Sequence, residues 1–396
     1  ASAVTPAARV AAAITILDEI VAGHPAERCL TAWARASRFA GSRDRAAVRD
    51  LVFDALRRRR SALWRSGQET ETGRALVTGL LADLSERDAL FDGSAHGPSP
   101  LSAAEAHALR PLEGAPRPVR LDVPDFLEEE LERSLEGALE PALEVLRSRA
   151  EVHLRVNTLK ATREAAVAAL VEDEIEVEAL PGPTALRVTR NPRRVAASRA
   201  YRDGLVELQD AASQAAAAAA AVVPGMTVLD LCAGGGGKTL ALGAAMAAKG
   251  RLYAYDLYPA RMKSLPERAR RAGVSVSILD RRELPRVLGS CDVVFVDAPC
   301  SGSGAWRRSP DAKWRLTPDS LATLVAVQKR LAAEALGYLR PGGHAVYATC
   351  SLLSAENADV LADLQTRAEG VAVSGETRLL PSSDQDGFFF ATLKQM

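Results

Sequence analysis

Residues 215–396 alternate short apolar runs with helical patterns, and this alternation most restricts the fold. The apolar runs end at or near Asp230, Asp256, Asp280, Asp297 and Cys350. Strands that alternate with helices build a parallel, doubly wound sheet. In such sheets ligands bind beyond the carboxyl ends of the strands. We therefore predict an α/β fold with a doubly wound, mostly parallel sheet, and a ligand site where these five residues meet.

Two regions with other patterns precede this domain. Residues 1–145 show helical periodicity and almost no strand signal, so an all-helical domain is expected. In residues 146–214, "EVHLRVN" alternates like a strand and "IEVEALPGPTALRVT" predicts a hairpin with its turn at Pro-Gly-Pro. A chain of 396 residues exceeds the usual size of one core. We therefore expect three domains, with residues 215–396 as the last.

The composition excludes several classes of protein. Lys plus Arg (50) balance Asp plus Glu (50), which argues against a uniformly basic surface but permits local basic patches. The five cysteines form no CxxC pair and no Cys/His cluster, so no metal site is expected. The alanine run 215–221 is too short to span a bilayer. We expect a monomer with free thiols in a reducing cytoplasm and no membrane partner.

The stretch "DLCAGGGGKT" joins a strand to a helix and predicts a cofactor-binding turn. A P-loop would need glycine where Cys232 stands, so that interpretation fails. A nicotinamide-binding turn would explain Asp256 alone, through the ribose hydroxyls. S-adenosylmethionine explains acids at four successive strand ends, because it carries a cationic sulfur, an α-amino group, ribose hydroxyls and an adenine amine. The alternative for Asp230 and Asp280 is that each caps a helix.

Several motifs occur in the order of a known family. "VLDLCAGGGGKT", "DLYPARM", "VDAPCSGSGAWRRSPDAKW", "YATCSLLSAEN" and "DGFFFATL" resemble the Sun/Fmu (RsmB-type) RNA cytosine carbon-5 methyltransferases. "LRVNTLKATRE" and "GLVELQDAASQ" resemble that family's preceding subdomain, and "SRDRAAVRDLVFDALRRRRSALW" resembles its NusB-like RNA-binding extension. The resemblance implies a class I, Rossmann-like methyltransferase domain, a small α/β subdomain at 146–214 and a NusB-like domain at 1–145. It implies S-adenosylmethionine as methyl donor and RNA as substrate, with 16S ribosomal RNA favoured by the helical extension.

The predicted cofactor contacts are the glycine loop, the acids at the following strand ends and one arginine of "DLYPARM". They are Cys232, Ala233, Gly234, Gly235, Gly236, Gly237, Lys238, Asp256, Arg261, Asp280 and Asp297.

Two cysteines follow strand ends, Cys300 in "DAPCSGSG" and Cys350 in "TCS". Carbon 5 of cytosine is a poor nucleophile, and a thiolate that adds to carbon 6 makes it enamine-like. A second group must then remove the proton from carbon 5 so that the thiolate can leave. The residues alone leave open which cysteine attacks. The resemblance implies that Cys350 is the nucleophile and that Cys300 assists release, with Asp297 at the base edge and Lys238 in the same pocket.

Basic residues near aromatic ones predict contact with single-stranded RNA. The predicted RNA contacts are Arg57, Arg58, Arg59, Arg60, Arg307, Arg308 and Lys313. For the first four, a solvated helix end is the alternative, and for Trp306, beside the last three, the alternative is packing. Two other functions stay open, namely the same chemistry on transfer RNA and a non-catalytic ribosome-assembly factor.

Overall fold

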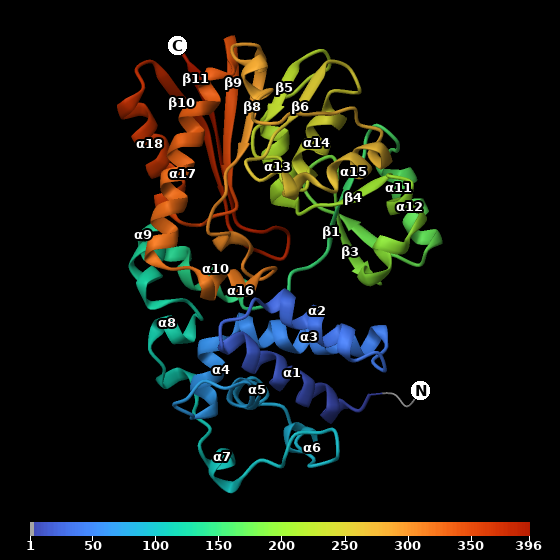
Figure 1. The fold of residues 1–396 in the computed structure, drawn as a ribbon, viewed down its shortest axis with the longest axis vertical. Helices are drawn as coiled ribbons and strands as arrows, with labels where there is room; N and C mark the ends of the chain where they lie inside the picture. Colours follow the sequence, from blue (N-terminus) through green and yellow to red (C-terminus); the bar gives the residue numbers. More distant parts are fainter. Residues whose placement is uncertain (1–3) are drawn as a thin grey trace. The chain divides into compact units, whose positions relative to one another are not determined.

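The computed structural model describes residues 4–396 and divides them into two compact units (Figure 1). The first unit comprises the chain up to Glu132, Gly137–Arg149 and Trp306–Arg315. The second comprises Arg133–Glu136, Ala150–Ala305 and Leu316–Met396. The sequence patterns predicted a change near residue 146, but no pattern predicted that residues 306–315 join the helical region.

The described residues of the first unit form helices and no strand. A cluster of buried side chains is its core, and Val48, Val52 and Leu56 contribute to it from one face of a single helix. Thr5 caps the first helix by accepting a hydrogen bond from the Ala8 N–H at 3.1 Å. The helices are α1 (Pro6–Val21), α2 (Ala26–Ala36), α3 (Ser42–Arg57), α4 (Arg59–Ser66), α5 (Gly73–Leu80), α6 (Arg87–Leu90), α7 (Ala103–His107), α8 (Arg117–Arg120), α10 (Leu139–Leu146) and α16 (Pro310–Arg315). A further helix, α9 (Glu128–Leu135), begins in this unit and ends in the second.

The second unit contains a small antiparallel sheet with the strand order β2-β3-β1-β4. Its strands are β1 (His153–Val156), β2 (Glu176–Ala179), β3 (Ala185–Arg190) and β4 (Val206–Leu208). Helices α11 (Arg163–Glu172) and α12 (Arg199–Arg202) pack with it around a core that includes Leu154, Leu170 and Val206. Thr162 caps α11. This is the region in which the sequence predicts a strand, a helix and a hairpin.

The main sheet has seven strands in the order β10-β11-β9-β8-β5-β6-β7. The strands are β5 (Thr227–Asp230), β6 (Arg251–Ala254), β7 (Ser277–Ile278), β8 (Cys291–Asp297), β9 (Leu339–Thr349), β10 (Val371–Leu379) and β11 (Phe388–Gln395). The five neighbouring strands β9, β8, β5, β6 and β7 are parallel, and β11 pairs antiparallel with β9 and β10. The predicted fold class, an α/β protein with a mostly parallel, doubly wound sheet, is therefore confirmed.

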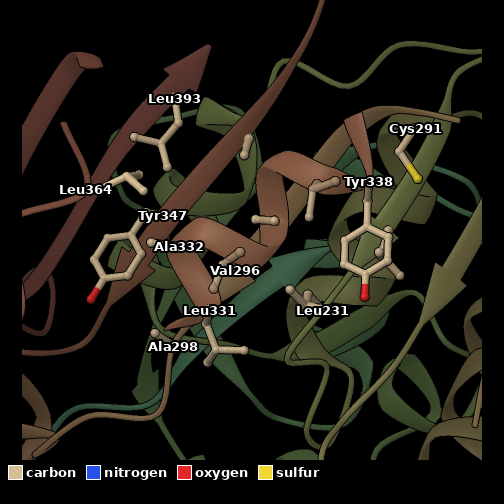
Figure 2. Close-up of a cluster of buried hydrophobic side chains, with 14 of the residues drawn as sticks. Leu231, Cys291, Val296, Ala298, Leu331, Ala332, Tyr338, Tyr347, Leu364 and Leu393 are labelled. Atoms are coloured by element: carbon tan, nitrogen blue, oxygen red, sulfur yellow. The ribbon is translucent and has the colours of Figure 1, made fainter. Parts of the chain in front are cut away.

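Helices cover both faces of this sheet, which is why β8 is a continuous apolar run. Val294 and Val296 of β8 belong to one core cluster, with α17 (Pro318–Gly337) and α18 (Ala358–Arg367) (Figure 2). Val293 and Phe295 face the opposite way. They belong to a second cluster, with α13 (Ala211–Ala219), α14 (Gly237–Ala245) and α15 (Leu265–Ala272). Figure 1 shows the two groups of helices on opposite sides of the strands.

The strand order reverses between β5 and β8, because the chain runs from β5 outward to β6 and β7 and then returns to β8 on the other side. Ligands bind at such a reversal, at the carboxyl ends of the strands. Asp230 of β5 pairs with Phe295 of β8, and Asp297 pairs with Ala348 of β9. The carboxyl ends of these three strands therefore lie side by side. In the described part of the chain, no helix is both long and apolar enough to cross a bilayer.

Candidate active site

The two cysteines that follow β8 and β9 lie together. The Sγ atoms of Cys300 and Cys350 are 3.6 Å apart, and both residues are half-buried. The Gly304 N–H donates to the Cys350 carbonyl at 2.8 Å and so joins the two loops. A side chain at Gly304 would bring its Cβ within 2.2 Å of the Gly387 carbonyl oxygen, so this close approach requires glycine.

Lys238 and Asp297 form an ion pair at the same strand ends. The Lys238 Nζ donates to Asp297 Oδ2 at 2.8 Å and lies 5.1 Å from the centre of the Phe388 ring. Burial lowers the pKa of Lys238, but the negative charges of Asp297, Cys350 and Asp230 outweigh it and raise the pKa overall. The ammonium group therefore persists in the site and interacts with the Cys350 sulfur.

The two thiols differ in their surroundings. The hydrogen bond with Cys350 and burial raise the pKa of Cys300 well above the ordinary value of a thiol. The negative charges of Cys350 and Glu356 act in the same direction. Cys300 therefore holds its proton more tightly than an ordinary thiol does. This effect could not be read from the sequence.

The glycine loop wraps between β5 and α14. Asp256 is 2% exposed, and its two carboxylate oxygens each accept a backbone N–H at 2.9 Å, Oδ2 from Gly234 and Oδ1 from Tyr258. Arg261 lies 3.5 Å from the same carboxylate. Gly236 has φ +88°, and a Cβ there would lie 2.2 Å from Leu265 Cδ1. The loop thus holds its open curve only with glycine at this position.

The other acids at strand ends have different environments. Asp230 is 1% exposed and its Oδ2 accepts a hydrogen bond from the Thr239 hydroxyl at 2.7 Å. Burial raises the pKa of Asp230 to about 7. Asp280 is exposed, and its Oδ1 accepts the N–H groups of Arg282 and Glu283 at 2.7 and 2.9 Å. Asp280 therefore makes the capping bonds of the alternative interpretation, and its contact with a cofactor stays a prediction.

The predicted RNA contacts in the first unit are largely occupied by bonds within that unit. Arg57 Nε donates to the Arg307 carbonyl at 2.8 Å, and Lys313 Nζ donates to the Arg57 carbonyl at 3.3 Å. Arg57, Arg307 and Lys313 are 6%, 2% and 2% exposed. Their burial does not favour contact with a phosphate in this conformation, and a role in RNA binding stays a prediction for these three. The reason for the burial is that residues 306–315 pack into the helical unit, where Trp306 is 1% exposed.

Among the remaining arginines of that set, Arg58, Arg59 and Arg60 are partly buried and Arg308 is exposed. Arg59 pairs with Glu71, and Arg60 donates to the Val123 carbonyl and pairs with Asp125. Arg58 Nε donates to the Arg147 carbonyl at 3.3 Å. A role in RNA binding stays a prediction for Arg58, Arg59, Arg60 and Arg308.

Sequence reasoning assigned no role to two residues of the site. Phe388 lies against Lys238, and Glu356 contacts both cysteine loops. Each lies in a motif quoted for the resemblance, "DGFFFATL" and "YATCSLLSAEN". The acid that follows Cys350 by six residues was the available signal, but spacing alone does not show that its side chain turns inward.

Two family models match the chain. Residues 217–394 match the model described as 16S rRNA methyltransferase RsmB/F. Residues 123–196 match a ferredoxin-like domain of RsmF/B-like methyltransferases. Together the two matches cover more than half of the chain.

Individual proteins give the same result. A ribosomal RNA small subunit methyltransferase B from Klebsiella pneumoniae is 33% identical over 263 residues, which are 63% of this chain and 61% of that protein. A probable ribosomal RNA small subunit methyltransferase B from Synechocystis is 32% identical over 265 residues, 61% of this chain and 59% of that protein. The chain thus spans about three fifths of these relatives. The crystal structure of PH0851 shares the fold over 99% of both chains, with a TM-score of 0.77 and 23% identity.

Proposed function

The chain belongs to the RsmB/F methyltransferase family, and from that premise we propose that it transfers a methyl group from S-adenosylmethionine to carbon 5 of a cytosine in RNA. The observation that carries this proposal is the pair of sulfurs 3.6 Å apart beside the Lys238–Asp297 ion pair. The proposed substrate is 16S ribosomal RNA, because the matching family model names it and both relatives are named for the small ribosomal subunit.

The glycine loop and Asp256 fit the proposed cofactor. S-adenosylmethionine, when bound, supplies an electrophilic methyl group. The positive φ of Gly236 lets the loop turn so that backbone groups, rather than side chains, lie at the carboxyl end of β5. Asp256 follows β6 and would hold the ribose hydroxyls, with Arg261 beside it. The loop residues 232–238 would line the cofactor, and Asp280 and Asp297 would complete its surroundings.

Attack on the base is assigned to Cys350. Its thiolate adds to carbon 6 of cytosine and forms a carbon–sulfur bond, and the electron pair of the 5,6 double bond becomes available at carbon 5 for the methyl group. The ammonium of Lys238 stabilises the thiolate before attack. Asp297 holds the pyrimidine edge at N3 and the exocyclic amine, where charge changes during the addition.

Release is assigned to Cys300. After methylation carbon 5 still carries its proton. Cys300, as a thiolate, takes this proton, the carbon–hydrogen electron pair restores the 5,6 double bond, and the bond between carbon 6 and Cys350 breaks with its electrons on sulfur. Because its pKa is raised, Cys300 must first pass its own proton to solvent water, and the thiolate that this leaves is a strong base.

Two cysteine variants test the roles. Cys300→Ala keeps the attacking thiolate but cannot release the base, so a covalent protein–RNA adduct should accumulate and appear as a slow band on a denaturing gel. Cys350→Ala and the double variant should be inactive and form no adduct. Cys291→Ala, which removes a buried thiol at the start of β8, is the matched control and should keep activity. An adduct in Cys350→Ala and none in Cys300→Ala would reverse the two roles.

The substrate requires a separate measurement. Bisulfite sequencing of ribosomal and transfer RNA from cells with and without the protein locates the 5-methylcytosine that depends on it. A site in 16S ribosomal RNA is expected. Loss of a transfer RNA site alone would move the substrate to transfer RNA. Tight RNA binding without any methyl transfer would indicate an assembly factor.

A further inference from the structure

A buried carboxylate lies between the two cysteine loops. Glu356 ends the short helix η8 (Ser354–Glu356) between β9 and α18 and is 0% exposed. Its Oε1 accepts the Ser301 N–H at 2.8 Å and the Gln328 amide at 3.0 Å. Its Oε2 accepts the Ser301 hydroxyl at 2.6 Å and the Ser351 hydroxyl. All these donors are neutral groups.

The donors connect Glu356 to both sulfurs through the chain. Ser301 directly follows Cys300, and Ser351 directly follows Cys350. A second set of bonds runs parallel to this bridge, because the Ser303 hydroxyl lies 3.1 Å from that of Ser351 and accepts the Leu352 N–H at 2.8 Å. One carboxylate thus fixes the residues that adjoin each sulfur.

The cost of burying this group indicates that it has a specific task. A buried charge without a cationic partner is unfavourable unless several hydrogen bonds satisfy it. Those bonds then allow only one arrangement of the groups that donate them, and a shift of about 1 Å between reacting groups can cost on the order of 100-fold in rate.

We propose that Glu356 is a positioning residue, which holds the two cysteine loops together so that one sulfur reaches carbon 6 while the other reaches the proton on carbon 5. The inference rests on the proposed function for its chemistry, but the geometry that it explains, the short distance between the sulfurs, can be measured without RNA or cofactor.

The first test therefore uses the protein alone. The oxidant diamide takes two electrons and two protons from the two thiols and joins their sulfurs in a disulfide, and proximity makes this reaction fast. Glu356→Gln should slow pairing of Cys300 with Cys350, followed by mass spectrometry, by on the order of 10- to 100-fold. Glu334→Gln changes an exposed glutamate that accepts a bond from the Tyr338 hydroxyl, and it should pair the sulfurs at the wild-type rate. Equal rates in both variants would overturn the proposal.

The second test uses RNA. In the Cys300→Ala background, Glu356→Gln should slow adduct formation by on the order of 10- to 100-fold while S-adenosylmethionine affinity by calorimetry stays at its wild-type value. A parallel loss of cofactor affinity would indicate a general structural role and overturn the proposal. If Cys300→Ala alone forms no adduct, the proposed function fails, whereas the diamide result still decides the role of Glu356.

A second variant guards against a change that prevents folding. Ser351→Ala removes the hydrogen bond from the Ser351 hydroxyl to Glu356 and keeps the carboxylate bonded to Ser301 and Gln328. It should slow sulfur pairing in the same direction and by less than Glu356→Gln. If folded Ser351→Ala forms the Cys300–Cys350 disulfide as fast as the wild-type protein, the proposal that Glu356 holds the two loops together is contradicted.

Discussion

Burial decides what individual acids do at the strand ends. Asp230 and Asp280 come from the same sequence pattern, an acid after an apolar run. Asp280 is exposed and caps the next turn, whereas Asp230 is enclosed and its pKa rises to about 7. The same sequence pattern therefore includes Asp230, whose ionisation at pH 8 lowers the free energy of unfolding.

This cost gives a prediction on pH and stability. The Asp230 carboxyl has an ordinary pKa of 3.8 when unfolded and about 7 when folded, so the folded state binds more protons between these values. Stability should fall as pH rises from about 4 to 7, and the loss persists above pH 7. A shift of this size corresponds to roughly 4 kcal/mol as an upper bound. Asp230→Asn should remove this dependence and raise the free energy of unfolding at pH 8 by roughly 1–4 kcal/mol.

Urea unfolding at pH 4.5 and pH 8 measures the effect. Asp319→Asn, a change of an acid in the first turn of α17, is the control. If the free energy of unfolding of Asp230→Asn still changes between the two pH values as much as that of the wild-type protein, Asp230 does not cause the pH dependence.

The sequence predicted residues of the site where a local pattern fixes the position. Cys300 and Cys350 were predictable because each follows an apolar strand, and parallel strands bring their carboxyl ends together. Glu356 was not predictable, because an acid in a polar loop has the same local pattern whether it points into solvent or inward. The burial of Arg57 was not predictable for a related reason, since its guanidinium donates to a carbonyl 250 residues away in the sequence.

Among the elements, the glycine loop depends on its neighbours. Gly234–Gly237 gives the backbone freedom, and α15 and β4 restrict it. Arg268 of α15 donates to the Gly235 carbonyl and to Glu207 of β4, and Glu207 is 1% exposed. Arg271 on the same helix also pairs with Glu207, at 2.9 Å. Arg268 and Glu207 thus restrict the glycine loop through side-chain contacts, and we call this pair the brace. The order of elements alone did not predict it.

Removal of the brace should weaken cofactor binding. In Arg268→Gln the Gly235 carbonyl loses its bond to a guanidinium, and ordering the glycine loop on binding costs more conformational entropy. A hydrogen bond to a charged group contributes roughly 1.5–3 kcal/mol, so S-adenosylmethionine should bind about 10-fold more weakly or worse by calorimetry. Arg270→Gln changes an exposed arginine of the same helix that bonds to the Pro266 carbonyl, and it should bind normally. Equal affinities in the two variants would show that the loop does not need the brace.

At the scale of the whole molecule, the chain passes between its two units more than once. Residues Ala150–Ala305, which include the Cys300 loop, belong to the second unit, whereas Trp306–Arg315 belong to the helical unit. The changes of pattern near residues 146 and 215 were visible in the sequence. The segment 306–315 was not, because tryptophans among cations form the same local pattern in an RNA-binding loop and in a packed one.

The crossing predicts that residues 150–396 will not be stable as a separate chain. In the full chain Trp306 is 1% exposed, and the Trp314 indole N–H donates to the Leu56 carbonyl at 2.6 Å. Without residues 1–149 these two indoles lose that environment, and burying an aromatic side chain contributes about 1.5–3 kcal/mol. We expect the truncated chain to bind a hydrophobic dye and to aggregate on heating below the Tm of the full chain.

Replacing residues 306–315 with a ten-residue Gly/Ser linker should reduce both effects, because the linker has no apolar side chain to bury. In the full chain the same replacement should instead lower the Tm, since the helical unit loses Trp306 and Lys313 from its interior. A truncated chain with the original segment that stays monodisperse and melts like the full protein would show that residues 150–396 do not depend on residues 1–149 for their stability.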